Sequence, residues 1–259
     1  MKGVENMGLD LQKASVSKRL AALMLDLIIF ILVATAAASL LSLILGYGGT
    51  VKAFEAHYQK YEEKYQIDAN MSAEEYNELT PEQKQRYEEA SRELAKDDEI
   101  VELYRSLINK TILVVFISLF IAFALTELAL PLIFKNGQTV GKKLFNLGVM
   151  RTDGVRVSSF QIFVRAIFGK FLIGTLLPVM FFMLDMFGVT GGMAILIVPL
   201  IVLLQAGLLI FTKNNYAIHD ALAVTVVVDM QGQMIFDTVE DLVAYRKALH
   251  EEMVRNTPY

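Results

Sequence analysis

The stretch "VSKRLAALMLDLIIF", residues 16–30, decides the fold, because it opens an apolar run long enough to cross a membrane. About 20 apolar residues, at about 1.5 Å each, span the roughly 30 Å of hydrocarbon in a bilayer. The run continues to residue 45 and is longer than the apolar region of about 7–15 residues in a signal peptide. We therefore predict a retained transmembrane helix at 20–45, after an N-terminal segment at 1–19.

The rest of the chain has the composition of a membrane protein. Hydrophobic residues make up 54% of its 259 residues, and the mean hydropathy is +0.45, both high for a soluble chain. Three more apolar segments are predicted to cross the membrane, at 112–134, 162–186 and 193–211. The predicted fold is therefore an all-α polytopic membrane protein, a bundle of four transmembrane helices.

Basic residues in the short flanking segments set the expected orientation. Lys13 and Lys18 precede the first helix, and a basic segment, 135–161, joins the second helix to the third. Because basic flanks stay on the cytoplasmic side, we expect both termini to be cytoplasmic in the plasma membrane. The segment 46–111 would then lie outside the cytoplasm, and the tail 212–259 inside it.

The segment 46–111 is acidic and has the pattern of short helices. Its residues 51–110 include nine Lys or Arg and fifteen Asp or Glu. "SAEE" and "TPEQ", which begin at Ser72 and Thr80, have the spacing of capping boxes, with Pro81 in the first helical position. We predict two or three short helices here and call the segment the acidic cap.

Aromatic side chains recur along the first part of the acidic cap at helical spacing. They are Phe54, Tyr58, Tyr61 and Tyr65. Such a stripe is typical of a packed helix face, and we interpret it first as packing within the cap. The alternative is that the stripe binds a ligand or a protein partner.

Several classes of chemistry have little support. The chain has no cysteine and three histidines, so disulfides, thiolate metal sites and thiol catalysis are excluded. Gly137 and Gly141 enclose three residues where a phosphate loop needs four, and Lys143 stands where Ser or Thr would bind magnesium. No nucleophile and base lie at catalytic spacing. We expect no enzyme activity, no cofactor, no metal site and no nucleic-acid partner.

The basic segment 135–161 is expected to lie at the cytoplasmic interface. Lys142 and Lys143 would face anionic headgroups in this arrangement. The apolar side of the segment would contain Val140, Leu144, Leu147 and Val149. Membrane lipids are thus the expected partners of this segment.

Three short motifs occur in order along the chain. The first, R-x-x-A-x-x-x-D, contains Arg19, Ala22 and Asp26. The second, T-x-G-K, contains Thr139, Gly141 and Lys142. The third lies in "HDALAVTVVV" and contains His219, Asp220 and Thr225.

Together these motifs resemble the RDD family of bacterial integral membrane proteins, named for an arginine and two aspartates. The resemblance covers about 16–45 and 112–230. It implies a membrane fold, and transport, including cation/proton exchange, has been suggested for some members. Eukaryotic relatives resemble scaffolds of membrane complexes. The resemblance does not explain residues 51–110.

Polar side chains are predicted at one depth in all four helices. Asp26 lies seven residues after Arg19, about 10 Å along a helix axis. The other helices contribute Glu127, Arg165, Lys170 and Gln205. An isolated charge costs about 2.5–3.5 kcal/mol on insertion scales, so we expect neutralising pairs, with Asp26 facing Arg165 or Lys170.

Glu127 has a second feature. Pro131, four residues later, cannot donate to its carbonyl, so a carboxylate and a free backbone oxygen would meet at one position. Such oxygens suit a hard cation; the alternative is a simple bend of the helix. We assign ion or proton binding to Asp26 and Glu127, with a structural ion pair as the alternative for Asp26.

Two other polar positions have alternative interpretations. Arg19 is expected to reach lipid phosphates or to hold the interfacial segment rather than to contact a substrate. His219 and Asp220 resemble a carboxylate-held imidazole that could sense pH. For Asp220, a helix cap or a packing role is favoured instead.

Two hypotheses of function follow. The first is a small ion-coupled transporter that exchanges a monovalent cation for a proton, and it would be a homo-oligomer because four helices enclose little volume. The second is a membrane scaffold that binds protein or lipid partners through the acidic cap, at residues 51–110, and through its basic inner face. A last helix, beginning at Asp237 with Glu240 in the capping position, would pack on the bundle or on a partner.

Overall fold

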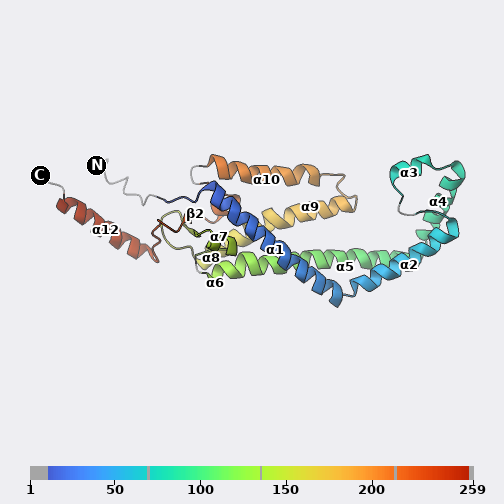
Figure 1. The fold of residues 1–259 in the computed structure, drawn as a ribbon, viewed down its shortest axis with the longest axis horizontal. Helices are drawn as coiled ribbons and strands as arrows, with labels where there is room; N and C mark the ends of the chain where they lie inside the picture. Colours follow the sequence, from blue (N-terminus) through green and yellow to red (C-terminus); the bar gives the residue numbers. More distant parts are fainter. Residues whose placement is uncertain (1–10, 69–70, 135, 213–214, 257–259) are drawn as a thin grey trace. The chain divides into compact units, whose positions relative to one another are not determined.

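The computed structural model describes residues 11–68, 71–134, 136–212 and 215–256. The chain forms two compact units, one made of residues 1–31 and 122–259 and the other of residues 32–121. In the described part, four helical segments are long and apolar enough to cross a membrane (Figure 1): Val16–Ile44, Asp98–Ile133, Ser159–Met186 and Ala194–Phe211. The prediction of four spans is confirmed, although the second helix begins well before residue 112 and the third three residues before 162.

The first and fourth spans are regular α-helices, α1 (Val16–Ile44) and α10 (Ala194–Phe211). The second and third spans each contain a π-helical part. In the second, α5 (Asp98–Phe123) continues into η1 (Ala124–Ala129) and α6 (Leu130–Ile133). In the third, α8 (Ser159–Val164) continues into η2 (Arg165–Leu176) and α9 (Leu177–Met186).

The π-helical parts place irregular backbone where the charged residues occur. In η1, the Leu130 amide closes an i→i+5 bond on the carbonyl of Leu125. Pro131 follows in the first turn of α6, the part of a helix where proline is tolerated. Single π-helical turns are frequent at functional sites. Glu127 lies in η1 and Lys170 in η2.

A small sheet, which the sequence did not predict, follows the short helix α7 (Val140–Leu144). Strands β1 (Leu147–Arg151) and β2 (Thr225–Asp229) pair antiparallel, with Leu147 opposite Asp229. The Ala14 amide donates to the carbonyl of Val227, and Lys18 pairs with Asp229 at 2.5 Å. The start of α1 is thereby joined to β2.

The sheet corrects the expected interfacial segment. Leu147 and Val149 are fully buried and pack on Ala14, Ala22 and Val227. They therefore cannot face lipid. Strand residues buried on both faces have no polar alternation, and for this reason the pattern 140–149 was wrongly interpreted as one amphipathic stretch.

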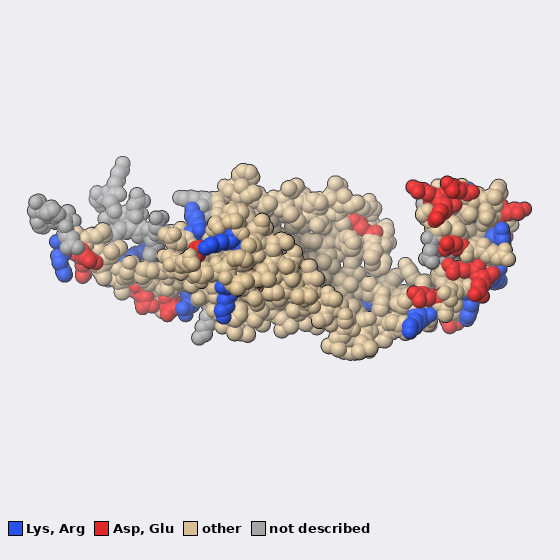
Figure 2. All heavy atoms as spheres, viewed as in Figure 1, with Lys and Arg blue, Asp and Glu red and all other residues tan. Residues whose placement is uncertain are grey.

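The second unit contains the acidic cap: α2 (Tyr47–Tyr65), α3 (Ala73–Glu78), α4 (Pro81–Leu94) and the first turns of α5. Both predicted capping boxes are confirmed, at Ser72 and Thr80. Their side chains accept hydrogen bonds from the amides three residues later, and Asp and Glu side chains gather on the surface of these helices (Figure 2). The caps of α3 and α4 thus depend on contacts three residues apart in the sequence.

The aromatic stripe packs the acidic cap together, as its spacing indicated. The ring of Phe54 lies 5.2 Å from that of Tyr58 and 6.2 Å from that of Tyr104. Tyr61 donates a hydrogen bond of 2.7 Å to Asp97, and Tyr65 donates to Glu93. The pKa of Tyr61 is raised to about 12, first by its hydrogen bond to Asp97.

Two more helices follow the fourth span. The short α11 (Ile218–Leu222) leads into β2, and α12 (Val239–Asn256) ends the described part. The last helix begins at Val239, two residues after the predicted start at Asp237, because Thr238 caps it together with Asp241. Beside α12, the rings of Phe236 and Tyr245 lie 5.3 Å apart.

Candidate functional site

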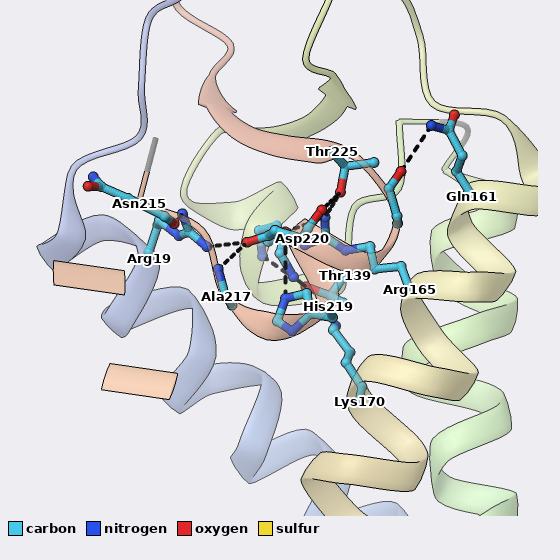
Figure 3. Close-up of polar contacts among 12 residues, drawn as sticks. Arg19, Thr139, Gln161, Arg165, Lys170, Asn215, Ala217, His219, Asp220 and Thr225 are labelled. Atoms are coloured by element: carbon cyan, nitrogen blue, oxygen red, sulfur yellow. Dashed lines mark hydrogen bonds and ion pairs between the residues drawn. The ribbon is translucent and has the colours of Figure 1, made fainter. Parts of the chain in front are cut away.

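A buried carboxylate, Asp220, connects four elements of the first unit (Figure 3). Its Oδ2 accepts from the Arg19 guanidinium at 2.8 Å and from the Ala217 amide at 3.0 Å. Its Oδ1 pairs with Arg165 Nη1 at 2.5 Å. Arg165 Nη1 also donates to the Thr225 hydroxyl at 2.8 Å. One carboxylate thus joins α1, η2, α11 and the start of β2.

The surroundings of Asp220 keep it ionised. Burial raises the pKa of this carboxyl, but the charges of Arg165 and Arg19 and the hydrogen bond from the Ala217 amide lower it more, so the net pKa is well below the ordinary value. A buried ion pair holds its partners in one geometry, although in the described part Asp220 Oδ1 has only its ion-pair contact and no hydrogen-bond partner. Asp220 is therefore a structural centre, as the packing interpretation held, and it also fixes Arg19, which was expected to reach lipid or the interfacial segment.

Asp26 has a different partner from the one expected. It accepts hydrogen bonds from the Thr139 hydroxyl at 2.5 Å and from the Gly141 amide at 2.7 Å. A side chain at Gly141 would collide with the backbone of Ala22 and with Asp26 itself. The carboxylate thus fastens α1 to the start of α7. The expected pairing of Asp26 with Arg165 or Lys170 was wrong, because α7 brings donors that helix depth alone could not place.

The membrane-embedded ion pair is instead Glu127 with Lys170, which joins η1 to η2. Their side chains are 15% and 19% exposed, so both reach accessible space. The carboxylate of Glu127 is thus occupied by an ammonium group. A lysine at this place leaves little support for a hard-cation site built on Glu127.

A cavity of ≈ 390 Å³ lies beside these groups in the first unit. Its polar lining consists of Arg19, Asp26, Glu127, Lys142, Arg165, Lys170, Gln205 and His219. The sequence therefore placed most of these residues in one layer, with Lys142 and His219 as exceptions, although it assigned several of their contacts wrongly. Gln205 lines the cavity from α10. We call the seven ionisable side chains Arg19, Asp26, Glu127, Lys142, Arg165, Lys170 and Asp220 the charged cluster.

The two lysines of α7 have separate surroundings. Lys142 lines the cavity, and its Nζ donates to the Thr139 hydroxyl at 3.2 Å. Burial, followed by the charge of Lys170, lowers the pKa of Lys142 to about 7. Lys143 instead lies over the ring of Phe134, 4.0 Å from its centroid. The prediction that both lysines face headgroups is thus corrected for Lys142, which the turn of α7 directs inward.

Arg165 has one buried nitrogen with no hydrogen-bond partner in the described part of the chain. This atom is Nη2, and the whole residue is only 4% exposed. A buried guanidinium nitrogen without a partner is costly, so it calls for an explanation. Arg165 is among the residues that line the cavity.

His219 is packed rather than poised to titrate. Burial lowers its pKa well below the ordinary value, so the imidazole is neutral near pH 7. A side chain at Gly169 of η2 would overlap the backbone of His219. This close approach fits a packing role for His219, and the pH-sensing interpretation has no support here.

The described residues contain no group of three or more His, Asp or Glu that could hold a metal ion. The sequence missed the role of Asp220 as the centre of the charged cluster, and it missed Lys142 as a cavity residue. The role of Asp220 had a signal in the sequence, because Asp220 and Arg19 both belong to the three motifs described above. No local pattern could show that the two meet across 201 positions.

Comparison with known proteins gives a family for this arrangement. A model of the RDD family matches residues 13–224, which include every residue of the charged cluster, the first two motifs and, from the third, His219 and Asp220. Searches among curated proteins and among solved structures found no match.

Proposed function

The chain belongs to the RDD family and is a multi-pass integral membrane protein, and from this premise we propose that it is a small proton-coupled transporter in which Glu127 carries the proton. The observation that supports this role is the Glu127–Lys170 pair, which borders the cavity between two π-helical segments. Ionisable residues inside membrane spans are costly and usually functional. Protonation of Glu127 would release Lys170 and change the charge of the cavity.

Asp26 is less suited to carry the proton. Both of its oxygens accept hydrogen bonds, and these bonds position α7. Protonation would weaken the attachment of α7 without freeing a mobile cation. We therefore assign Asp26 an architectural role, and we assign the titrating role to Glu127 alone.

The exchanged species is the second part of the proposal. The sequence led us to expect exchange of a cation for a proton. The position of Glu127 supports the transfer of the proton. The bound cation has less support, because Arg19, Lys142, Arg165 and Lys170 all line the cavity. A monovalent cation would have to displace Lys170 from Glu127.

We propose that the charged cluster lies in the cytoplasmic half of the plasma membrane. Lys18 and Lys143, at the same end of the unit as α7 and the sheet, support this orientation by the excess of basic residues in cytoplasmic flanks. Homo-oligomerisation remains part of the proposal, since a four-helix unit encloses little volume.

The test is proton flux into proteoliposomes that contain a trapped pH-sensitive dye. Glu127→Gln should reduce flux at least tenfold, because the amide cannot carry the proton. Thermal unfolding in detergent, measured in parallel, shows whether the protein remains folded. The double variant Glu127→Gln, Lys170→Met removes the unpaired ammonium and should recover any lost stability but no flux.

Lys143→Gln is the matched control, because Lys143 is a nearby lysine outside the cavity, and it should retain flux. Full flux in the folded Glu127→Gln variant would overturn the proposal. Sodium or potassium gradients across the same vesicles show whether a cation is exchanged.

A second candidate is a membrane scaffold, which the acidic cap favours. This segment forms its own packed helices and exposes many carboxylates. Replacing Glu88, Glu89 and Glu102 with Gln should then abolish binding to a basic partner protein and leave proton flux unchanged. Flux loss in these variants, or unchanged binding, would remove this candidate.

A further inference from the structure

The charges that line the cavity do not balance. Four cationic side chains line it, Arg19, Lys142, Arg165 and Lys170, against the carboxylates of Asp26 and Glu127. Including Asp220, which pairs with both arginines, leaves one cation in excess. A cavity inside a membrane protein cannot keep an unbalanced charge cheaply.

The excess positive charge lies on two side chains that have unused hydrogen-bond donors. Glu127 is paired with Lys170, and Asp26 is hydrogen-bonded to α7. Lys142 has no carboxylate within ion-pair distance in the described part, and its Nζ meets only the Thr139 hydroxyl there. Arg165 Nη2 is buried and has no hydrogen-bond partner among the described residues. Together these two groups offer unfilled, charge-assisted donors to an anion.

The lowered pKa of Lys142 agrees with this charge count. Burial and the charges of Lys170 and Arg165 disfavour the ammonium form of Lys142, and they outweigh the opposing charges of Glu127 and Asp26. An anion in the cavity would supply the missing negative charge.

The rim of the cavity is apolar and faces outward. Leu20 and Leu23 of α1 and Val202 of α10 line the cavity and are 52%, 60% and 59% exposed. Both helices are membrane spans, so these exposed side chains contact hydrocarbon in a bilayer. The cavity therefore combines a cationic end with an apolar border, as an amphiphilic anion requires.

We propose that the cavity binds the phosphate group of an anionic lipid, with Lys142 and Arg165 as its donors and the acyl chain lying between α1 and α10. Lysine and arginine are the side chains that bind phosphate in proteins, and hydrogen bonds to charged groups are the strong ones. The two carboxylates of the cavity are occupied by other donors, Asp26 by α7 and Glu127 by Lys170. The ligand class rests on the transport function proposed above, because the same cavity would be its substrate site.

Binding and flux are measured separately, so that each can fail alone. Purified protein in detergent is titrated with dioctanoyl phosphatidic acid, with dioctanoylglycerol and with inorganic phosphate, and thermal stabilisation is recorded. The phosphatidic acid should stabilise the protein saturably, whereas dioctanoylglycerol should not. Inorganic phosphate should bind at least tenfold more weakly, since it lacks the acyl contacts.

Two variants test the donors and the rim. Lys142→Met should weaken phosphatidic acid binding about tenfold or more, the loss expected for one charged hydrogen bond. Lys143→Met is the matched control and should bind as the wild type does. Val202→Trp, on an exposed position, should weaken lipid binding without changing phosphate binding.

The outcomes separate the sources of the anion. Equal affinity for inorganic phosphate and phosphatidic acid would overturn the proposal that the ligand is a lipid that enters from the bilayer. Equal binding of dioctanoylglycerol, or unchanged binding in folded Lys142→Met, would overturn the phosphate site. If Lys142→Met does not fold, Lys142→Gln provides the same comparison. Loss of proton flux in Glu127→Gln with intact lipid binding would leave both proposals standing.

Discussion

The acidic cap and the charged cluster both contain many ionised residues, but they use them in opposite ways. In the cap, Arg92 pairs with Glu88 one helical turn away, and the two side chains are 72% and 55% exposed. In the cluster, Asp220 is fully buried and pairs with Arg19 across 201 positions. Charges in the cap keep a soluble surface, whereas charges in the cluster hold distant segments together.

The difference follows from solvent. Water screens the exposed pairs of the cap, so each contributes about 0–1 kcal/mol. A buried charge that loses its partner has no water to replace it, and removal costs about 3–5 kcal/mol. An exposed ion pair of the cap therefore contributes much less to stability than a buried ion pair of the cluster. The following substitutions test this contrast.

The largest effect is expected from Asp220→Asn. The change leaves Arg19 and Arg165 buried without their carboxylate, and it should destabilise the protein by about 3–5 kcal/mol. Thermal unfolding in detergent measures the loss. A change below about 1 kcal/mol would contradict the role of Asp220 as the structural centre.

The pH dependence gives an independent check on Asp220. Its folded pKa lies below the ordinary value of 3.8, so its stabilisation is present above that pH and is lost as the pH falls below it. The stability of the wild type should therefore decline more steeply below pH 4 than that of Asp220→Asn. Parallel curves for the two proteins would show that Asp220 is not held ionised by the arginines.

A smaller loss is expected from Asp26→Ala. It removes the acceptor of the Thr139 hydroxyl and of the Gly141 amide, and buried donors left without a partner cost about 1–3 kcal/mol. Limited proteolysis should then cut near α7, where the wild type is protected. If Asp26→Ala keeps full stability but loses proton flux, Asp26 has a role in transport rather than in architecture.

In the acidic cap, Thr80→Ala should cost about 1 kcal/mol, because the hydroxyl caps α4. The loss should be confined to this segment, and hydrogen exchange of the amides of α4 is the direct measurement. Thr80→Ser is the control, since it retains the capping oxygen. Faster exchange in α11 or β2 would show that the cap and the charged cluster unfold as one unit.

The smallest effect is expected from Arg92→Gln. The exposed pair with Glu88 contributes about 0.3–0.5 kcal/mol, and salt should reduce it further. Thermal unfolding at low and at high ionic strength should therefore differ little between this variant and the wild type. A loss as large as that of Asp220→Asn would remove the distinction between the two regions.

Features that depend on local chemistry were predictable. The four spans follow from continuous apolar segments, and the capping boxes at Ser72 and Thr80 follow from contacts three residues apart. Most residues around the cavity were also found, with Lys142 as an exception, since charged side chains at one depth in a membrane must gather away from lipid. By itself, the sequence thus determined the four spans, the capped helices of the acidic cap and most of the residues of the site.

The tertiary structure alone decided which charge meets which. Asp26 binds α7, Lys170 pairs with Glu127 and Arg165 pairs with Asp220, and these contacts depend on the positions of segments between 43 and 115 residues apart. Likewise, β1 and β2 pair across about 80 residues, and their burial on both faces hides the period of a strand. A local sequence pattern depends only on a residue's neighbours in the chain. Its partner in the folded protein is determined by long-range packing.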